Sequence, residues 1–242
     1  MTTNLLDVDR IAQVHNECID YFLRHLKPKP TVRDIERAAA DFYSANTGEK
    51  LNKAQSKWLS MKVASIDVHR LTIHEMGLSS GLRDYLARVR QAMGASLHPS
   101  EVTTARKLNR KSFAKLDAFD QWLADAYFAT LAASSVVWTT ASGSGVIAYA
   151  GSGPDGSHHY TDWGKVITAD ATAAVGELAA WGLSAAAGLA APPVGVTAAA
   201  ILAIAAAIAS FLYWLSGDAT VIIERDPGPG TPGGGGEERP PV

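Results

Sequence analysis

Apolar residues recur at every third or fourth position through the first half of the chain, which is the spacing of one face of an α-helix. This spacing predicts five amphipathic helices, over about residues 8–26, 31–42, 52–76, 80–94 and 99–127. Pro28 and Pro30 mark the end of the first helix, and Thr31 with Asp34 forms a capping-box-like start for the second. Amphipathic helices separated by short breaks are typical of a helical bundle, so the pattern predicts a mainly α fold.

Formal charge almost disappears in the second half of the chain. Residues 126–154 and 178–217 contain no Asp, Glu, Lys or Arg, over 29 and 40 positions respectively. Pro192 and Pro193 divide the longer stretch and predict the turn of a helical hairpin. The second arm, 194–215, provides about 33 Å of helix, enough to cross a hydrocarbon core of about 30 Å. The first arm, 178–191, reaches only about 21 Å, so to cross it would have to extend back through Glu177 and toward Asp170.

The residue types along this hairpin suit a helix that is only marginally stable in lipid. Alanine dominates the second arm and is less membrane-seeking than Leu, Ile or Phe. Aromatic residues cluster at the end of that arm, where an interfacial belt would lie. The residues predicted to enter a bilayer are Leu178, Trp181, Leu183, Leu189, Val194, Ile201, Leu202, Ile204, Ile208, Phe211, Leu212, Tyr213, Trp214 and Leu215.

Small residues recur at four-residue spacing along both arms, which permits close approach between helices. The residues predicted to pack helix on helix are Gly182, Ser184, Gly188, Ala199, Ala203 and Ala207. An alternative explains the same pattern: both arms form the buried centre of a soluble bundle. A helix that is apolar all round is found either in a core or in a membrane.

The shorter uncharged stretch predicts a different element. β-branched and aromatic residues at 136–140 and 146–149 flank a Ser/Gly turn, which favours one small apolar β-hairpin. A second transmembrane helix is the alternative, and the Ser and Gly residues at its centre disfavour it. Residues 151–164 are typical of a turn-rich connector, and 220–223 of a short strand. The Pro- and Gly-rich residues 226–242 predict a disordered tail.

The charges divide the 242-residue chain into three regions. Residues 1–115 carry 19 Lys and Arg against 12 Asp and Glu, residues 116–217 carry one against seven, and residues 218–242 carry two against five. We therefore expect a charged amphipathic helical bundle, a low-charge membrane-active region that contains the hairpin 178–215, and a short strand with a disordered tail.

A basic cluster lies at the end of the first region. Three of its lysines fall at four-residue spacing, on one face of a continuous helix. Such a face predicts contact with an anionic lipid surface, and a solvated face of the bundle is the alternative. The members of the cluster are Arg106, Lys107, Arg110, Lys111 and Lys115.

No catalytic signature accompanies these elements. The sequence has no GxSxG, HExxH, GxGxxG or phosphate-loop motif, and its single cysteine, Cys18, excludes a disulfide framework. His69 and His74 lie about 140° apart around a helix, so they would not chelate one ion. Core packing explains His15 beside Cys18, and a surface turn explains the two histidines at 158–159. We therefore predict a protein that is not an enzyme and that uses no metal or other cofactor.

The order of these elements resembles the pore-forming domains of colicin-type bacteriocins and, more loosely, other α-helical pore-forming toxins. The likeness is architectural and covers about residues 100–215: amphipathic helices up to Tyr127, followed by the hairpin bent at Pro192 and Pro193. It implies that a charged bundle keeps a hydrophobic hairpin in solution and releases it into a bilayer. Glu177 in the first arm departs from that pattern. The apolar segment 136–149 is instead similar to the membrane-seeking tongue of another α-helical toxin class.

Three functional hypotheses follow from these observations. The first is a conditionally membrane-inserting helical protein that permeabilises a lipid bilayer as a homo-oligomer. The second is a stably anchored membrane protein with a soluble helical recognition domain. The third is a soluble assembly protein that buries its Ala-rich helices at subunit interfaces. Nucleic acid is not expected as a partner, because no stacking aromatics are interleaved with the basic cluster.

The start of the chain sets an expectation for localisation. Asp7, Asp9 and Arg10 are unlike a secretory signal peptide. We expect a membrane-associated protein whose soluble form is cytoplasmic before insertion or is secreted without a cleaved signal. The sequence leaves open whether a partner or immunity protein accompanies it.

Overall fold

A computed structural model describes residues 6–27, 29–66, 78–93, 99–142, 147–152, 158–186, 196–217 and 220–223 of the chain. Most of these residues are helical, which confirms the predicted mainly α bundle. The helices are α1 (Val8–His25), α2 (Val32–Thr47), α3 (Lys53–Ser65), α4 (Ser80–Met93), α5 (Pro99–Leu108), α6 (Arg110–Phe113), α7 (Ala118–Ser142), α8 (Trp163–Ala186) and α9 (Val196–Ser216). The strands are β1 (Ile147–Ser152), β2 (His158–Asp162) and β3 (Thr220–Ile223).

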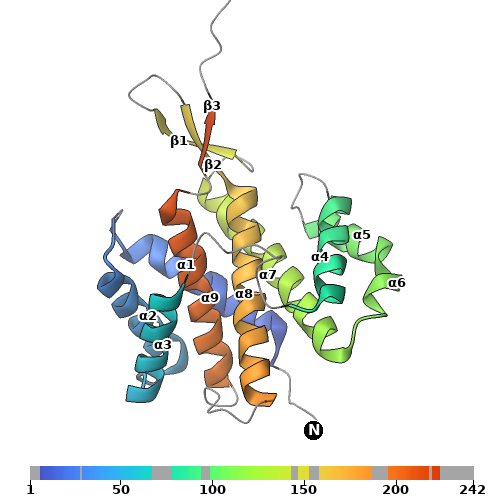
Figure 1. Ribbon diagram of the computed structural model, residues 1–242. Coiled ribbons are helices and arrows are strands. Elements are labelled where there is room, and N and C mark those ends of the chain that lie inside the picture. Colours follow the sequence, from blue (N-terminus) through green and yellow to red (C-terminus); the bar gives the residue numbers. More distant parts are fainter. Residues whose placement is uncertain are drawn as a thin grey trace, which may run out of the picture.

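Four helices, α1, α7, α8 and α9, form the centre of the bundle. Figure 1 shows α7, α8 and α9 side by side, and α1 packs against both α7 and α9. Helices α2 and α3 cover α9 on one side, while α4 and α5 lie against α7 on the other. The amphipathic helices of the first region therefore surround the low-charge helices of the second.

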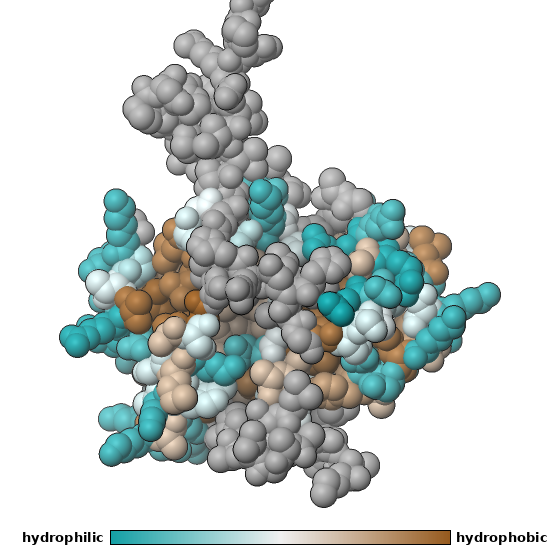
Figure 2. Space-filling model, viewed as in Figure 1, coloured by the Kyte–Doolittle hydropathy of each residue, from teal (hydrophilic) through white to brown (hydrophobic). Residues whose placement is uncertain are grey.

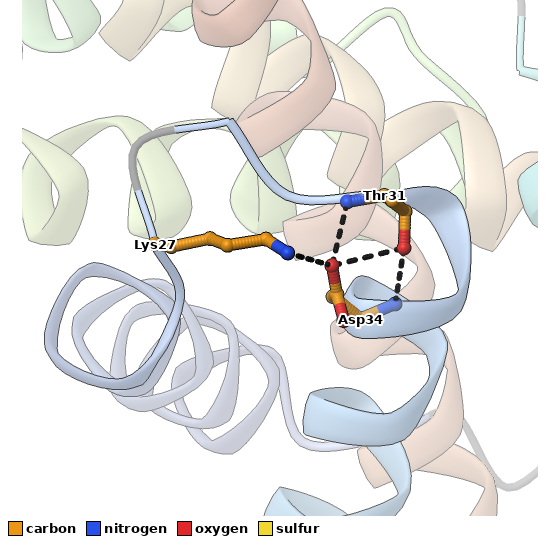
Figure 3. A network of polar contacts seen from close by, with 3 residues as sticks. All are labelled: Lys27, Thr31 and Asp34. Carbon is orange, nitrogen blue, oxygen red and sulfur yellow. Dashed lines mark hydrogen bonds and ion pairs between the residues drawn. The ribbon is translucent and has the colours of Figure 1, made fainter.

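The start of α2 illustrates how polar residues set the helix ends. Figure 3 shows Thr31 and Asp34 in a reciprocal capping box: the Asp34 backbone N–H donates to Thr31 Oγ1 over 3.2 Å, and the Thr31 N–H donates to Asp34 Oδ2 over 2.8 Å. The Lys27 ammonium lies 3.2 Å from the same carboxylate oxygen. These bonds satisfy backbone donors that a helix start leaves unpaired, as the sequence pattern predicted.

Two predicted helix boundaries are wrong. The third helix ends at Ser65 and not near residue 76, because the backbone turns extended at Ile66. The helix predicted over residues 99–127 is broken into α5, α6 and α7. The Asp117 carboxylate accepts a hydrogen bond from the Asp120 N–H over 2.8 Å, so Asp117 caps a new helix. Leu116 therefore does not share a helix with Tyr127.

The strands form one antiparallel sheet in the order β1-β2-β3. The sheet lies at the end of the bundle where α7 ends and α8 begins (Figure 1). Strand β3 confirms the predicted strand at 220–223. The predicted hairpin is wrong in its first strand, because residues 136–140 belong to α7, and β1 pairs instead with β2 inside the predicted connector.

Tertiary packing explains why residues 136–140 are helical although their composition favours a strand. The Trp138 side chain is fully buried, and its ring stacks on that of Trp163 with centroids 4.9 Å apart. Burial of a large aromatic side chain outweighs the weak β-propensity of the Val-Val-Trp-Thr-Thr segment. Helix α7 therefore continues to Ser142.

The face of the bundle seen in Figure 2 carries many hydrophilic residues. In the view of Figure 2, hydrophilic residues spread over the α2–α3 side and the α4–α6 side, and hydrophobic residues show only in separate patches. Four large apolar side chains among the described residues stand well exposed: Val32, Met61, Leu108 and Val136. Leu108 is the most exposed of the four, at 75%.

Candidate functional site

Helix α9 lies at the centre of the bundle and is buried on all its faces. Every residue from 198 to 211 is buried, including the polar Ser210. Ala198–Ser216 is the one described helix that is long and apolar enough to cross a membrane, and 78% of its apolar window is buried inside the protein. The core helix of a soluble protein has the same two properties. Length and composition alone therefore leave both interpretations of α9 open.

The predicted insertion residues gather in this core. Those that are buried are Leu178, Trp181, Ile201, Leu202, Ile204, Ile208 and Phe211; those that are partly buried are Leu212, Tyr213, Trp214 and Leu215. The side chain of Leu183 and the residues Leu189, Val194, Pro192 and Pro193 lie outside the described part of the chain. The structure thus buries the described apolar residues of the two arms inside the bundle.

The small residues allow this storage. Ala199, Ala203 and Ala207 are buried within the bundle. Gly182 of α8 lies directly against the Phe119 ring of α7, so close that a Cβ atom there would collide with the ring. In this state the small residues serve packing within one chain. The side chain of Ser184 and the residue Gly188 are outside the described part of the chain.

An aromatic cluster surrounds the end of α9 that the sequence analysis assigned to a membrane interface. The Phe211 ring packs edge-on against Phe22 of α1, with centroids 5.3 Å apart. The Trp214 ring lies 5.9 Å from that of Trp138, which also stacks on Trp163. These rings join α9 to α1, α7 and α8.

A buried polar cluster, which the sequence analysis did not identify, joins the same four helices. Trp138 Nε1–H donates to Asp170 Oδ2 over 2.6 Å, and His15 Nε2 lies 3.3 Å from the Ser210 hydroxyl. Asn16 extends the second pair to α7, since its Oδ1 lies 3.0 Å from His15 Nδ1 and accepts from the Ser134 hydroxyl over 3.1 Å. The Ser134 and Ser210 hydroxyls both act on the Asp170 carboxyl and so link the two pairs. The polar cluster is His15, Asn16, Ser134, Trp138, Asp170 and Ser210.

Asp170 is the member of the polar cluster whose charged form is least favoured by burial. Its side chain is fully buried in α8, and Oδ1 makes no well-formed hydrogen bond among the described residues, although the Ser134 and Ser210 hydroxyls lie near the carboxyl. Burial raises the pKa of the Asp170 carboxyl, against the lowering effects of His15, Trp138, Ser210 and Ser134. Asp170 is one of only two acidic residues in α8, and an acid in so apolar a helix was the signal that could have pointed to it.

The second acidic residue of α8, Glu177, forms an ion pair with a residue of α3, outside the four central helices. Its carboxylate lies 2.8 Å from the Lys62 ammonium of α3, and the two side chains are only 16% and 27% exposed. The residue that departs from the colicin-like pattern is thus neutralised by a residue of a surrounding helix. Removal of α8 from the bundle would separate this pair.

The basic cluster does not form one helical face, so that prediction is wrong. Helix α5 ends at Leu108, and α6 contains only four residues. Arg106 is engaged within the bundle, where its guanidinium pairs with Asp125 and lies 5.1 Å above the Phe128 ring. The other four members of the basic cluster remain exposed, namely Lys107, Arg110, Lys111 and Lys115.

The histidines and the cysteine lie either in the core or outside the described part of the chain. His15 and Cys18 are both fully buried in α1, and burial raises the pKa of the Cys18 thiol well above its usual value. His69 and His74 lie outside the described residues, as do the side chains of 158–159. Among the residues that the structure describes, no group of three or more His, Cys, Asp or Glu could hold a metal ion.

Comparison with protein-family models, with curated proteins and with solved structures found no match to this chain.

Proposed function

We propose that this chain is a conditionally membrane-inserting helical protein that permeabilises a bilayer. The observation that carries the proposal is the storage of Ala198–Ser216, an uncharged helix long enough to span a membrane, inside amphipathic helices of the same chain. A helix that must later enter lipid has to be kept from water first. The surrounding α1, α2, α3 and α8 serve that purpose in this arrangement.

The composition of α9 makes the two environments close in free energy. Alanine gains less from leaving water than Leu or Ile does, whether it enters a protein core or a bilayer. A helix built mainly from alanine is therefore held by many small contacts. A modest change in binding energy can shift such an equilibrium from the core to the membrane.

The polar cluster lowers the stability of the stored state further. An ionised carboxylate that is buried without full hydrogen bonding is unfavourable, and Asp170 occupies such a site in α8. When α8 and α9 leave the bundle, Asp170 can reach water or lipid headgroups. A first arm extended back to about 20 residues would begin near residue 172, so Asp170 would lie at the edge of the bilayer and not at its centre.

The exposed part of the basic cluster provides a first contact with lipid. Each Lys or Arg near an anionic surface contributes about 1 kcal/mol, so the four exposed members together contribute about 4 kcal/mol at low salt. They lie immediately before α7 in the chain. Docking at this position would hold the bundle at the surface while α8 and α9 separate from it.

The test is dye release from anionic and neutral liposomes with detergent-free protein, together with liposome flotation and labelling of the thiol of Cys18. Cys18 lies on α1, which packs against α9, and is fully buried in the bundle. We expect slow thiol labelling in solution, faster labelling on anionic liposomes, and leakage with the same time course. Folded protein that neither floats nor causes leakage would contradict the proposal and leave α9 as a permanent core helix.

A charge placed in the apolar helix separates insertion from surface binding. Ile204→Asp would test insertion, but Ile204 is 1% exposed and the substitution would also disrupt the stored state. Leu212→Asp is preferable, because Leu212 is only partly buried near the end of α9. Met61→Asp, at an exposed position of α3, is the matched control. We expect leakage to be reduced by Leu212→Asp, which places a charge near the interfacial end of the span, and kept with Met61→Asp. Protein that is always found in membranes and needs detergent would favour the stably anchored alternative.

A further inference from the structure

A groove runs along the surface between α1 and α7. It has a volume of about 680 Å³, and its floor includes Ala129, Ala133 and Val136 of α7. Val136 is 56% exposed although it is apolar. A hydrophobic floor that is open to water indicates a surface that another group can cover.

The rim of this groove is acidic. Asp9, Glu17 and Asp20 of α1 line it, and no lysine or arginine is among the described residues that do so. Glu17 accepts hydrogen bonds only from the neutral amides of Gln13 and Asn46 in the described structure. Asp20 pairs with Arg24, which is well exposed. The groove is therefore apolar at its floor and negative at its edge.

A surface with the opposite character lies at the junction of α5 and α6. Leu108, the most exposed of the four exposed large apolar side chains, stands there between Lys107 and Arg110, with Lys111 one residue further on. We define these four residues as the basic knob. An exposed apolar side chain with basic residues next to it in the chain is opposite in charge to the acid-lined, partly apolar groove.

The knob and the groove are neighbours on one chain. Asp9 and Ala129 line the α1–α7 groove and also line a second cavity, of about 620 Å³, to which Lys107 and Arg110 contribute. Leu108 nevertheless remains 75% exposed, so the knob does not fill its own chain's groove. Because the two surfaces adjoin, two chains related by a twofold axis can each place a knob in the other's groove.

We propose that this chain forms a reciprocal homodimer in solution, in which the basic knob of each copy occupies the α1–α7 groove of the other. The partner is a second copy because the charge and the apolar character of the two surfaces match on the same molecule. This inference does not rest on membrane insertion, since both surfaces are accessible in the stored state. An isologous contact of this kind forms twice per dimer, which doubles each pairwise contribution.

A charge exchange tests the dimer directly. Sedimentation velocity in lipid-free buffer, at low and high salt, would measure association of three chains. They are the wild type, a knob variant (Lys107→Glu with Lys111→Glu) and a groove variant (Glu17→Lys with Asp20→Lys). We expect the wild type to dimerise more weakly at high salt, and each variant alone to associate at least about tenfold more weakly.

Mixing the two variants gives the decisive result. In the mixed dimer, the acidic knob meets the basic groove and the unchanged knob meets the unchanged groove, so both contacts are attractive. One contact in the mixed dimer keeps the wild-type charges and the other pairs a knob of net −1 with a groove of net +1. We therefore expect the equimolar mixture to associate more strongly than either variant alone, toward the wild-type value. Lys53→Glu with Lys57→Glu, at exposed positions of α3, is the matched control and should leave association unchanged. Leu108→Ser should weaken association without any change of charge, and circular dichroism checks that each variant is folded.

Three results would overturn the proposed dimer. A wild type that stays monomeric at every concentration would exclude the dimer. Variants that associate as the wild type does would exclude these surfaces, and so would a mixture that associates no more strongly than either variant alone. Because no lipid is present, a failure here leaves the leakage experiment unaffected, and a failure of leakage leaves the dimer unaffected.

Discussion

Replacement of Asp170 by Asn tests whether the buried carboxylate lowers the stability of the bundle. The substitution keeps an oxygen that can accept from Trp138 Nε1–H and removes the buried negative charge. Burial raises the pKa of Asp170 above its ordinary value of 3.8, so the folded chain holds this proton more tightly than the unfolded chain does. The stability that the carboxyl provides is then complete below about pH 4. It is lost as the pH rises from 3.8 through the folded pKa.

The size of the effect follows from the extra cost of an unpaired charge over an unpaired neutral group, because the Asn amide still places a polar atom where Oδ1 lies. A buried polar group without a hydrogen-bond partner costs about 1–3 kcal/mol, and the cost is higher when the group is charged. We therefore expect Asp170→Asn to raise the free energy of unfolding by about 1–3 kcal/mol at pH 8. For a chain of this size, that gain corresponds to an increase in Tm of about 2–10 °C. At pH 4 the two proteins should differ little.

Thermal and urea unfolding between pH 4 and pH 8 would measure this difference, because contributions from the other titrating groups cancel between variant and wild type. The same protein should release dye from anionic liposomes more slowly, since the bundle that holds the hairpin is more stable. Asp41→Asn, at an exposed position of α2, is the control and should change neither quantity. An Asn variant that is less stable than the wild type at pH 8 would refute the reasoning, because it would mean that the ionised carboxylate stabilises the fold.

Three further predictions concern other contacts of the bundle. Lys62→Met removes the cation that neutralises the mostly buried Glu177, so it should lower the stability by about 1 kcal/mol in urea titrations and speed dye release. Gly182→Ala places a methyl group against the Phe119 ring, and the overpacking should lower the stability by about 1–3 kcal/mol in chemical denaturation. Asp34 should titrate by NMR with a pKa of about 2, because the Thr31 backbone N–H, the Thr31 hydroxyl and Lys27 all favour its charged form. The stability it provides is present above pH 3.8 and is lost as the pH falls through about 2, and Asp34→Asn should lack this acid-dependent loss.

Each of these predictions has a matched control on the same chain. Lys57→Met removes an exposed lysine from α3 and should leave both stability and leakage unchanged. Gly81→Ala tests a glycine whose added Cβ would meet only ordinary contacts, 3.6 Å from Leu116, so stability should not fall. For Asp34, Thr31→Ala removes the capping hydroxyl, which should move the pKa of Asp34 back toward 3.8. A Lys57 variant as unstable as the Lys62 variant would show that the ion pair is not the cause.

The sequence predicted the helices well where amphipathic periodicity and helix signals coincide. The capping box at Thr31 and the helix over 80–93 are present as expected. Local signals failed where burial decides the conformation. The segment 136–140 has β-branched residues on both sides of Trp138, but packing of that indole against Trp163 and Asp170 keeps it helical.

The candidate site was predicted in its apolar part and missed in its polar part. Length and composition were enough to identify the uncharged helix at 196–216. The polar cluster joins His15 to Ser210, which are 195 residues apart in sequence, and no local pattern indicates such a contact. The basic cluster was found from its charges, but its members do not share one helical face because α5 ends at Leu108 and α6 contains only four residues.

The polar cluster places a buried carboxylate beside the apolar helix α9, and this arrangement needs a physical explanation. A core meant only for stability gains little from Asp170, since a well-packed apolar residue of similar volume avoids the cost of burying charge. The cluster instead gives the hairpin a few directional contacts, to His15 on α1 and Trp138 on α7, among many weak alanine contacts. Such contacts fix the register of α8 and α9 in the bundle. They are also contacts that water or lipid headgroups can replace once the helices separate, whereas lost side-chain packing is replaced only by lipid. Asp170→Asn should therefore be compared with the wild type in both stability and leakage. The comparison tests whether the buried carboxylate weakens the bundle and whether it also promotes the proposed release of α8 and α9.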